Sequence, residues 1–195
     1  MQLIMVPGID GSDARHWQTL WEQKDGADRI APSSWSAPDL ADWTSAISTA
    51  VRSREHVVLI AHSLGCLAVA HWLGEPDNAA QGVLMVAPPD PTGVNFPSSA
   101  APTFVDLAPK PLPVPGLVVT STNDPYCTPD AAQEMSRRWQ LPHIDVGPRG
   151  HLNTASNLGD WPHGHTLLTT FLATLDPTPT PDTPPNRTAG SALPL

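Results

Sequence analysis

The stretch that decides the fold is Val57-Val58-Leu59-Ile60-Ala61-His62-Ser63-Leu64-Gly65-Cys66-Leu67. Its first five residues are all apolar and begin with two β-branched valines, which predicts a strand buried on both faces. Apolar residues continue from Leu67 to Leu73 and predict a buried helix. A serine therefore stands at the apex of a strand–turn–helix unit.

The small-x-Ser-x-Gly spacing of Ala61, Ser63 and Gly65 is typical of a nucleophile elbow. Such a turn holds the serine backbone in a strained conformation, and bulk two residues to either side would collide with neighbouring elements. The turn lifts Oγ above the sheet edge and directs the first free N–H groups of the helix to the same point. The alternative is an ordinary strand–helix junction with serine as N-cap. Because the first small residue is alanine and not glycine, the pattern alone leaves both interpretations open.

Composition narrows the class of protein. At 195 residues the chain fits one domain with a sizeable core. A net charge of −9 argues against nucleic acid or an anionic membrane as the main partner. There is no run of about 18 apolar residues, and the start of the chain is predicted to be a strand and not a signal peptide. Two cysteines, Cys66 and Cys127, form no disulfide framework or CxxC site, so we expect a cytoplasmic protein.

Strands alternate with helices along residues 1–175, which predicts an α/β domain with a doubly wound, mostly parallel sheet of about five or six strands. Strands are expected at 3–6, 28–31, 57–61, 82–87, 116–120 and 144–146. Helices are expected after a cap at Ser12 or Asp13, and at 39–54, 67–73, 129–139 and 166–175. Residues 176–195 are rich in Pro and Thr and predict a disordered, polyproline-biased tail whose partner, if any, is unknown.

Ligands of open α/β sheets bind at the carboxyl ends of the strands, so the residues at those ends are the candidates for chemistry. Ser63, Asp124 and His151 follow three different predicted strands, in the order Ser, Asp, His that the α/β-hydrolase layout requires. Gly8-Ile9-Asp10 follows the first strand. A serine, a carboxylate and a histidine at one edge of the sheet indicate the α/β-hydrolase layout much more strongly than the elbow pattern alone.

The candidate roles follow from physical need. A serine hydroxyl is a weak nucleophile, so His151 would accept its proton and later protonate the leaving group. Asp124 would hold the imidazole in the productive tautomer. The oxyanion needs fixed donors, and the backbone N–H groups of Leu64 and Ile9 are the candidates, with Gly8 leaving the loop room to turn.

Other residues compete for these roles or invite other interpretations. Asp90 also follows a strand, but the order of the residues along the chain and the position of the strand before Asp124 favour Asp124 as the acid. His143 precedes its strand, and His163 and His165 fall near the last helix, so His151 is preferred as the base. We expect His62 to make a structural hydrogen bond, and Cys66 and Cys127 to be small apolar fillers. His16 and Trp17 are candidates for the pocket or the core, and Trp161 is a candidate wall of the acyl pocket. Four apolar residues are expected to help roof the pocket: Phe96, Phe104, Val105 and Leu107.

The chain resembles the small serine hydrolases of the α/β-hydrolase superfamily, which include bacterial YdeN-like proteins and the animal retinoblastoma-binding serine hydrolase. The resemblance covers residues 1 to about 172. The stretches that carry it are Val6-Pro7-Gly8, His16-Trp17, Ala61-His62-Ser63-Leu64-Gly65, Asn123-Asp124-Pro125-Tyr126, Gly150-His151-Leu152-Asn153 and Gly159-Asp160-Trp161-Pro162-His163-Gly164. It implies a minimal, lidless hydrolase without metal or cofactor, with Ser63, Asp124 and His151 as its triad. The Leu-x-Cys-x-Glu pattern of the animal members is absent, so their protein partner is not carried over, and the tail lies outside the family pattern.

The sequence therefore predicts a serine hydrolase that cleaves small carboxylic esters through an acyl-enzyme, with amides and thioesters left open. Gly8, Asp10 and Trp161 are the candidate substrate-binding residues. The alternatives are a non-catalytic binding protein with the same fold and a dinucleotide-binding domain. The latter fails the G-x-G-x-x-G spacing after the first strand.

Overall fold

The computed structural model describes residues 1–175, and the predicted tail at 176–195 lies outside the described residues. Strands and helices alternate along the described part. The strands are β1 (Gln2–Val6), β2 (Asp28–Arg29), β3 (Val57–His62), β4 (Gly82–Val86), β5 (Gly116–Thr120) and β6 (His143–Asp145). The helices are α1 (Trp17–Asp25), α2 (Leu40–Val51), α3 (Leu64–Leu73), α4 (Pro129–Trp139) and α5 (Pro162–Leu175), with short 3-10 helices η1 (Pro102–Phe104) and η2 (Thr154–Ser156).

Within residues 1–175, six strands form one sheet in the order β2-β1-β3-β4-β5-β6, and every pair is parallel. The central strand β3 pairs with β1 on one side and β4 on the other, and all six of its residues are buried. Both backbone edges and both side-chain faces of β3 are thus covered, as its apolar run predicts. The parallel direction brings all the strand ends that carry candidate residues to one edge.

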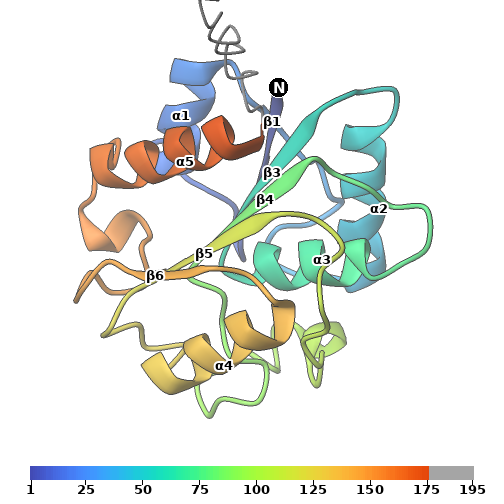
Figure 1. Cartoon of the computed structure of the whole chain (residues 1–195). Coiled ribbons are helices and arrows are strands. Elements are labelled where there is room, and N and C mark those ends of the chain that lie inside the picture. The colour runs from blue at the N-terminus through green and yellow to red at the C-terminus, as the bar shows by residue number, and fades with distance from the viewer. Residues whose placement is uncertain (176–195) are drawn as a thin grey trace, which may run out of the picture.

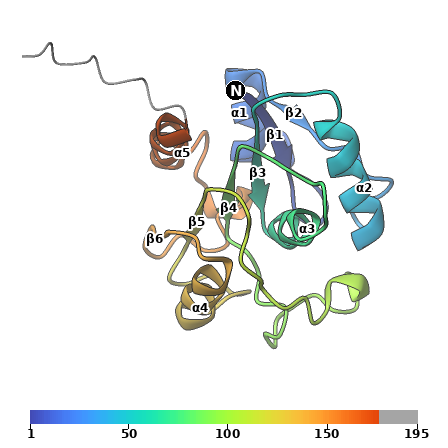
Figure 2. The same cartoon turned by 45° about the vertical axis from the view of Figure 1, so that its right-hand side comes forward.

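Helices cover both faces of the sheet (Figures 1 and 2): α1 and α5 lie on one face, and α2, α3 and α4 on the other. Two hydrophobic clusters fill the two interfaces. Trp43 of α2 and Trp139 of α4 belong to the cluster on the α2–α3–α4 face. Trp17 and Trp21 of α1 belong to the cluster beneath α1 and α5. The predicted doubly wound architecture is confirmed.

Several element boundaries differ from the sequence-based expectation by one to four residues. Helix α1 is capped by His16, whose Nδ1 accepts the N–H of Gln18, and not by Ser12 or Asp13. Asp13 instead accepts the N–H of Arg15 in the preceding turn. Helix α5 begins at Pro162, four residues before the expected Thr166, and β6 begins at His143, one residue early.

The segment between β4 and β5 was expected to roof the pocket with its large apolar side chains. The structure corrects this expectation for Phe104, which is fully buried and packs against Trp43 with ring centroids 5.6 Å apart. Smaller residues of the segment line the cavity near Ser63 instead: Pro89, Pro97 and Ala100. The large aromatic side chains thus anchor the segment to the core and leave its small residues over the site.

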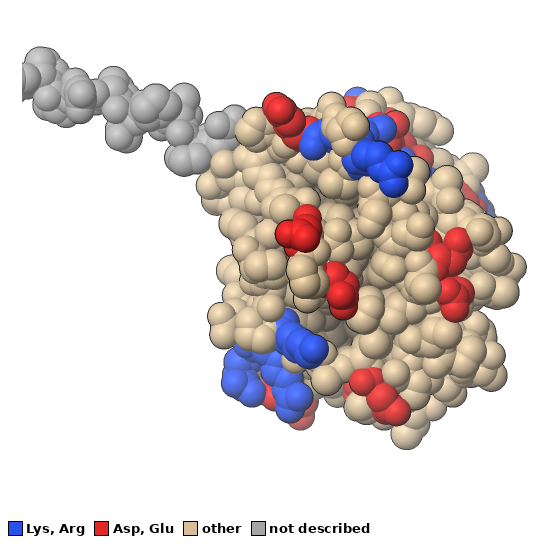
Figure 3. Space-filling model, turned by 90° about the vertical axis from the view of Figure 1, so that its right-hand side faces the viewer, with Lys and Arg blue, Asp and Glu red and all other residues tan. Residues whose placement is uncertain are grey.

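No helix within residues 1–175 is both long and apolar enough to cross a lipid bilayer. Figure 3 shows one face of the molecule, on which uncharged residues predominate and the described Lys and Arg side chains lie in small groups near the edges. On this face the described residues form no broad basic patch.

Candidate active site

Ser63 stands at the sharp turn between β3 and α3 with its backbone at φ 53° and ψ −128°. A residue with a side chain rarely adopts this conformation, which costs about 1–3 kcal/mol and persists only when its surroundings enforce it. Here the preceding strand is paired on both sides, and the Ser63 N–H donates to the carbonyl of Val86 at 2.9 Å. The strained turn that the elbow pattern predicts is therefore present.

Two glycines allow the β1 loop to pass close to this turn. A Cβ on Gly65 would lie 2.2 Å from the carbonyl oxygen of Val6, so no larger residue fits there. A Cβ on Gly8 would lie 2.7 Å from the Ser63 Cβ and 3.1 Å from its Oγ. The absence of both side chains therefore lets the backbone of residues 6–9 approach the serine hydroxyl.

A histidine and a carboxylate lie in line with this hydroxyl. His151 Nε2 is 2.8 Å from Ser63 Oγ, and His151 Nδ1 is 2.8 Å from one oxygen of Asp124 and 3.0 Å from the other. Because a carboxylate only accepts hydrogen bonds at neutral pH, Nδ1 carries the imidazole proton and Nε2 accepts from the serine hydroxyl. The structure thus brings together Ser63, His151 and Asp124.

The loops that carry Asp124 and His151 are joined by hydrogen bonds. Asp124 Oδ1 also accepts the N–H of Tyr126 at 2.9 Å, which orients the carboxylate. Asn123 Oδ1 accepts the N–H of Gly150 at 2.7 Å, and Ser121 Oγ accepts the N–H of Arg149 at 2.8 Å. Sequence reasoning did not foresee this connection, because its partners are 27 and 28 residues apart.

Two backbone N–H groups are free beside the serine. Within residues 1–175, neither the N–H of Ile9 nor that of Leu64 has a hydrogen-bond acceptor, and both residues line the cavity around Ser63. Leu64 is the first residue of α3, so the positive end of that helix adds to the field at this point. Both candidate oxyanion donors are therefore unpaired at the serine.

His62 lies beside His151, and His16 lies beside His62. His62 Nε2 is 3.0 Å from the carbonyl oxygen of His151, so this nitrogen carries the proton and donates. Burial keeps the pKa of His62 well below its ordinary value, with His16 and His151 adding to the effect. His62 is thus a structural hydrogen-bond donor that holds the backbone of the base. His16 contacts it with ring centroids 4.8 Å apart.

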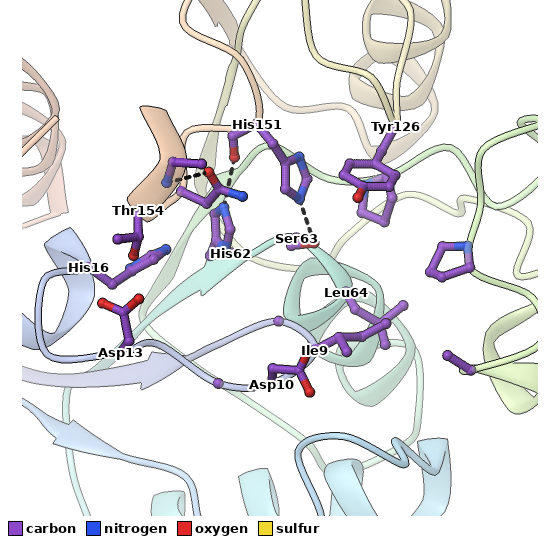
Figure 4. Close-up of a pocket in the computed structure, with 17 residues that line it drawn as sticks. Ile9, Asp10, Asp13, His16, His62, Ser63, Leu64, Tyr126, His151 and Thr154 are labelled. Carbon is purple, nitrogen blue, oxygen red and sulfur yellow. Dashed lines mark hydrogen bonds between the residues drawn. The ribbon is translucent and has the colours of Figure 1, made fainter. Parts of the chain in front are cut away.

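The cavity at the serine has a volume of about 570 Å³ (Figure 4), a size typical of small-molecule sites. Gly8 and Asp10 line it, where the sequence analysis placed candidate substrate contacts, and so does His16. Lining residues that sequence reasoning missed are Tyr126, Asn153, Thr154 and Ala155. They adjoin Asp124 and His151 in the chain, and that adjacency was the available signal.

Trp161 does not line this cavity, contrary to expectation. It packs in the cluster beneath α1 and α5, with its ring 5.3 Å from that of Trp17 and stacked 5.9 Å from that of Trp21. Trp17 is also a core residue, and its indole N–H donates to the carbonyl of Leu152 at 2.8 Å. Trp17 therefore holds the loop that carries His151, and Trp161 packs against Trp17.

The side chains of the competing residues bond to other partners. Asp90 accepts the N–H and hydroxyl of Thr92 within its own turn. His143 Nε2 is 2.6 Å from the hydroxyl of Thr120, and His165 pairs with Asp25 on α1. Among residues 1–175, no group of three or more potential metal ligands lies together.

Both thiols are buried. Burial raises the pKa of Cys66 far above its ordinary value and that of Cys127 to about 12, with nearby Asp124 and Asp90 adding to the rise at Cys127. They match the apolar fillers that the sequence suggested.

Six parallel strands in this order, with a strained serine at the turn after β3 and a histidine–carboxylate pair on later strand ends, define the α/β-hydrolase class of proteins. The family model of the serine hydrolases matches residues 3–170, and the chain belongs to that family.

Solved structures agree with this assignment. A protein described as a YdeN-like hydrolase, from Pectobacterium atrosepticum, is 33% identical over 90% of this chain and 92% of its own, with a TM-score of 0.81. The ydeN gene product of B. subtilis is 20% identical over 88% and 98%, with a TM-score of 0.72. A monoacylglycerol lipase from Paleococcus ferrophilus shares the fold at 13% identity over 90% and 95%, with a TM-score of 0.68. No curated protein matches the chain in sequence.

Proposed function

We propose that this hydrolase cleaves small carboxylic esters through an acyl-enzyme formed on Ser63. The observation that carries the proposal is the 2.8 Å contact between Ser63 Oγ and an His151 Nε2 whose opposite nitrogen is held by Asp124. A serine with a base in reach and a third group orienting that base is the arrangement that nucleophilic catalysis needs.

In the first half-reaction, Ser63 Oγ attacks the ester carbonyl carbon while His151 Nε2 takes the hydroxyl proton. The carbonyl oxygen becomes an oxyanion that accepts from the N–H groups of Ile9 and Leu64. When the intermediate collapses, the bond to the alcohol oxygen breaks and His151 donates its proton to that oxygen. Asp124 stabilises the transient imidazolium throughout.

In the second half-reaction, a water molecule gives its proton to His151 and attacks the acyl carbon. The bond to Ser63 Oγ breaks, the serine regains the proton from His151, and the acid is released. Every proton moves through one nitrogen, which is why the contact between Nε2 and Oγ matters most.

A fluorophosphonate probe tests the proposal directly. We expect it to label Ser63 in the wild type and to label nothing in a folded Ser63→Ala protein. A folded wild type that resists the probe and cleaves no ester would favour a non-catalytic binding protein. A panel of 4-nitrophenyl esters of graded chain length, run beside aminoacyl amides and a short acyl thioester, determines the acyl class.

The acid has a matched control within the chain. We expect Asp124→Asn to lower kcat by roughly 10⁴-fold, because the amide supports the wrong tautomer of the base. Asp90→Asn should leave kcat within about twofold, since the Asp90 carboxylate bonds to Thr92 in its own turn and not to His151. The reverse pattern would assign the acid to Asp90.

A further inference from the structure

The cavity at Ser63 has two chemically different sides. In Figure 4, Asp13, His16 and Thr154 lie on one side of Ser63, and Tyr126 lies on the opposite side. The proline-rich segment that precedes β5 contributes apolar lining. The proposed reaction steps use none of the polar groups on the first side, so these groups are available for another task.

His16 is the distinctive member of this polar side, because one of its ring nitrogens is buried without a partner. The residue is 4% exposed, and its Nε2 is the one buried side-chain nitrogen or oxygen within residues 1–175 that lacks a hydrogen bond. Buried polar groups are nearly always paired, and an unpaired one calls for an explanation such as a ligand. His16 also lines the cavity.

The hydrogen bonding of the ring shows what Nε2 can do. The N–H of Gln18 donates to His16 Nδ1 at 3.2 Å, so Nδ1 holds the lone pair and the proton is on Nε2. Burial lowers the pKa of His16 to about 4, against the opposing effect of Asp13, so the ring is neutral at pH 7. Nε2–H is therefore a neutral donor.

The ring is held in this orientation by the core. Gln18, whose N–H bonds to Nδ1, is fully buried, and its side-chain amide donates to the carbonyl of Ile60 on β3. Its side-chain oxygen accepts from Ser12 at 2.7 Å. The His16 ring also packs against Trp17 and His62, at centroid distances of 5.3 and 4.8 Å. Buried neighbours therefore fix the orientation of the ring that carries the unpaired Nε2–H donor.

We propose that His16 Nε2–H donates a hydrogen bond to an acceptor oxygen of the substrate, separate from the scissile carbonyl. This inference rests on the proposed function and narrows the substrate to esters that carry an ether, hydroxyl or second carbonyl oxygen. The carboxylates of Asp10 and Asp13 line the same cavity, so the oxygen belongs to a neutral group and not to an anion.

Two pairs of esters matched in heavy-atom count test this. 4-Nitrophenyl 3-methoxypropionate and 4-nitrophenyl valerate differ by one oxygen in the acyl chain. 2-Methoxyethyl acetate and n-butyl acetate differ likewise in the alcohol. For each pair the readout is the ratio of kcat/KM for the oxygenated ester to that for the alkyl ester. Comparing this ratio between the wild type and a variant cancels the difference in intrinsic reactivity between the two esters.

Two substitutions separate the role of His16 as a hydrogen-bond donor to substrate from its role as the N-cap of α1. His16→Asn keeps an oxygen acceptor for the N–H of Gln18 but does not reach the Nε2 position, whereas His16→Gln carries an N–H to that position. We expect the ratio for at least one pair to fall about threefold to tenfold in His16→Asn, the range for one neutral hydrogen bond. It should stay within about twofold in His16→Gln and in the control His163→Asn, which alters an exposed histidine of α5. Wild-type ratios for both pairs in His16→Asn would overturn the inference.

A binding measurement separates this inference from the proposed function and requires no substitution at position 16. In Ser63→Ala labelled with ¹⁵N-histidine, 2-methoxyethyl acetate should shift the His16 Nε2 resonance, and n-butyl acetate should not. Equal effects of the two esters, or none, would overturn the polar subsite. If the wild type cleaves no ester while the shift occurs, the proposed function fails and the subsite stands.

Discussion

Gly8→Ala is the most informative single change for the geometry of the site. The added methyl would lie 2.7 Å from the Ser63 Cβ, whereas ordinary van der Waals contact begins at 3.4 Å. The two backbones must therefore separate by about 0.7 Å. The β1 loop carries the Ile9 N–H, so the separation displaces one candidate oxyanion donor from the nucleophile.

Two magnitudes follow. Overpacking of this kind costs roughly 1–3 kcal/mol of the free energy of unfolding. Misplacement of a reacting group by about 1 Å costs on the order of 10²-fold in rate, so we expect kcat/KM to fall between about 10-fold and 100-fold. The assays are hydrolysis of 4-nitrophenyl acetate, the rate of fluorophosphonate labelling and urea denaturation.

Gly26→Ala is the control for lost stability. Gly26 has a φ of +68°, so alanine is strained there by roughly 1–2 kcal/mol, but its Cβ meets no atom within 4 Å. This variant should lose stability and keep its activity. If Gly8→Ala retains kcat/KM within twofold, the β1 loop does not set the position of an oxyanion donor.

Three further results are expected. Trp17→Phe leaves the carbonyl of Leu152 without its donor, so urea denaturation should show a loss of roughly 1–3 kcal/mol in the free energy of unfolding. We also expect kcat to fall, because the neighbouring His151 is held less firmly. An unchanged kcat would show that His151 is held without the Trp17 hydrogen bond. The pKa of His16 is about 4 in the folded protein and lies below its unfolded value, so its stabilising contribution is present above pH 6.5 and is lost as the pH falls towards 4. His16→Gln should therefore flatten the slope of the unfolding free energy against pH by up to about 1.4 kcal/mol per pH unit. Parallel slopes for the wild type and the variant would contradict this. Burial raises the pKa values of Cys66 and Cys127, so iodoacetamide should alkylate neither thiol at pH 8 until urea unfolds the chain; rapid labelling of the native protein would contradict it.

The strand–turn–helix unit around Ser63 was predictable because its signals are local. A run of apolar residues fixes β3, and small residues at set distances from the serine fix the turn. The parallel direction of the strands then predicts that the ends bearing Asp124 and His151 share one edge. That is why the structure brings these residues together as the sequence analysis expected.

The remaining features depend on contacts between distant parts of the chain. The bond from Trp17 to the carbonyl of Leu152 spans 135 residues and has no periodic signal. Helix α5 was expected to begin at Thr166, after His163-Gly164-His165. In the structure α5 begins at Pro162 and includes Gly164, where a Cβ would lie 2.2 Å from the Trp161 ring, so that only glycine fits. Only the position of Trp161 in the core explains this glycine.

Ser63 and His151 are held in different ways, and this difference predicts where the candidate site is deformable. Ser63 follows a strand that is paired on both sides, so its strained turn is fixed by the sheet. His151 lies on a loop beyond the edge strand β6, and its backbone carbonyl is held by the buried donor of His62. The connection through Asn123 ties the same loop to the acid. Because these supports are individual hydrogen bonds, small movements of His151 require less free energy than movements of Ser63. Substitutions among the supports should therefore act on proton transfer, while the position of the serine is unchanged.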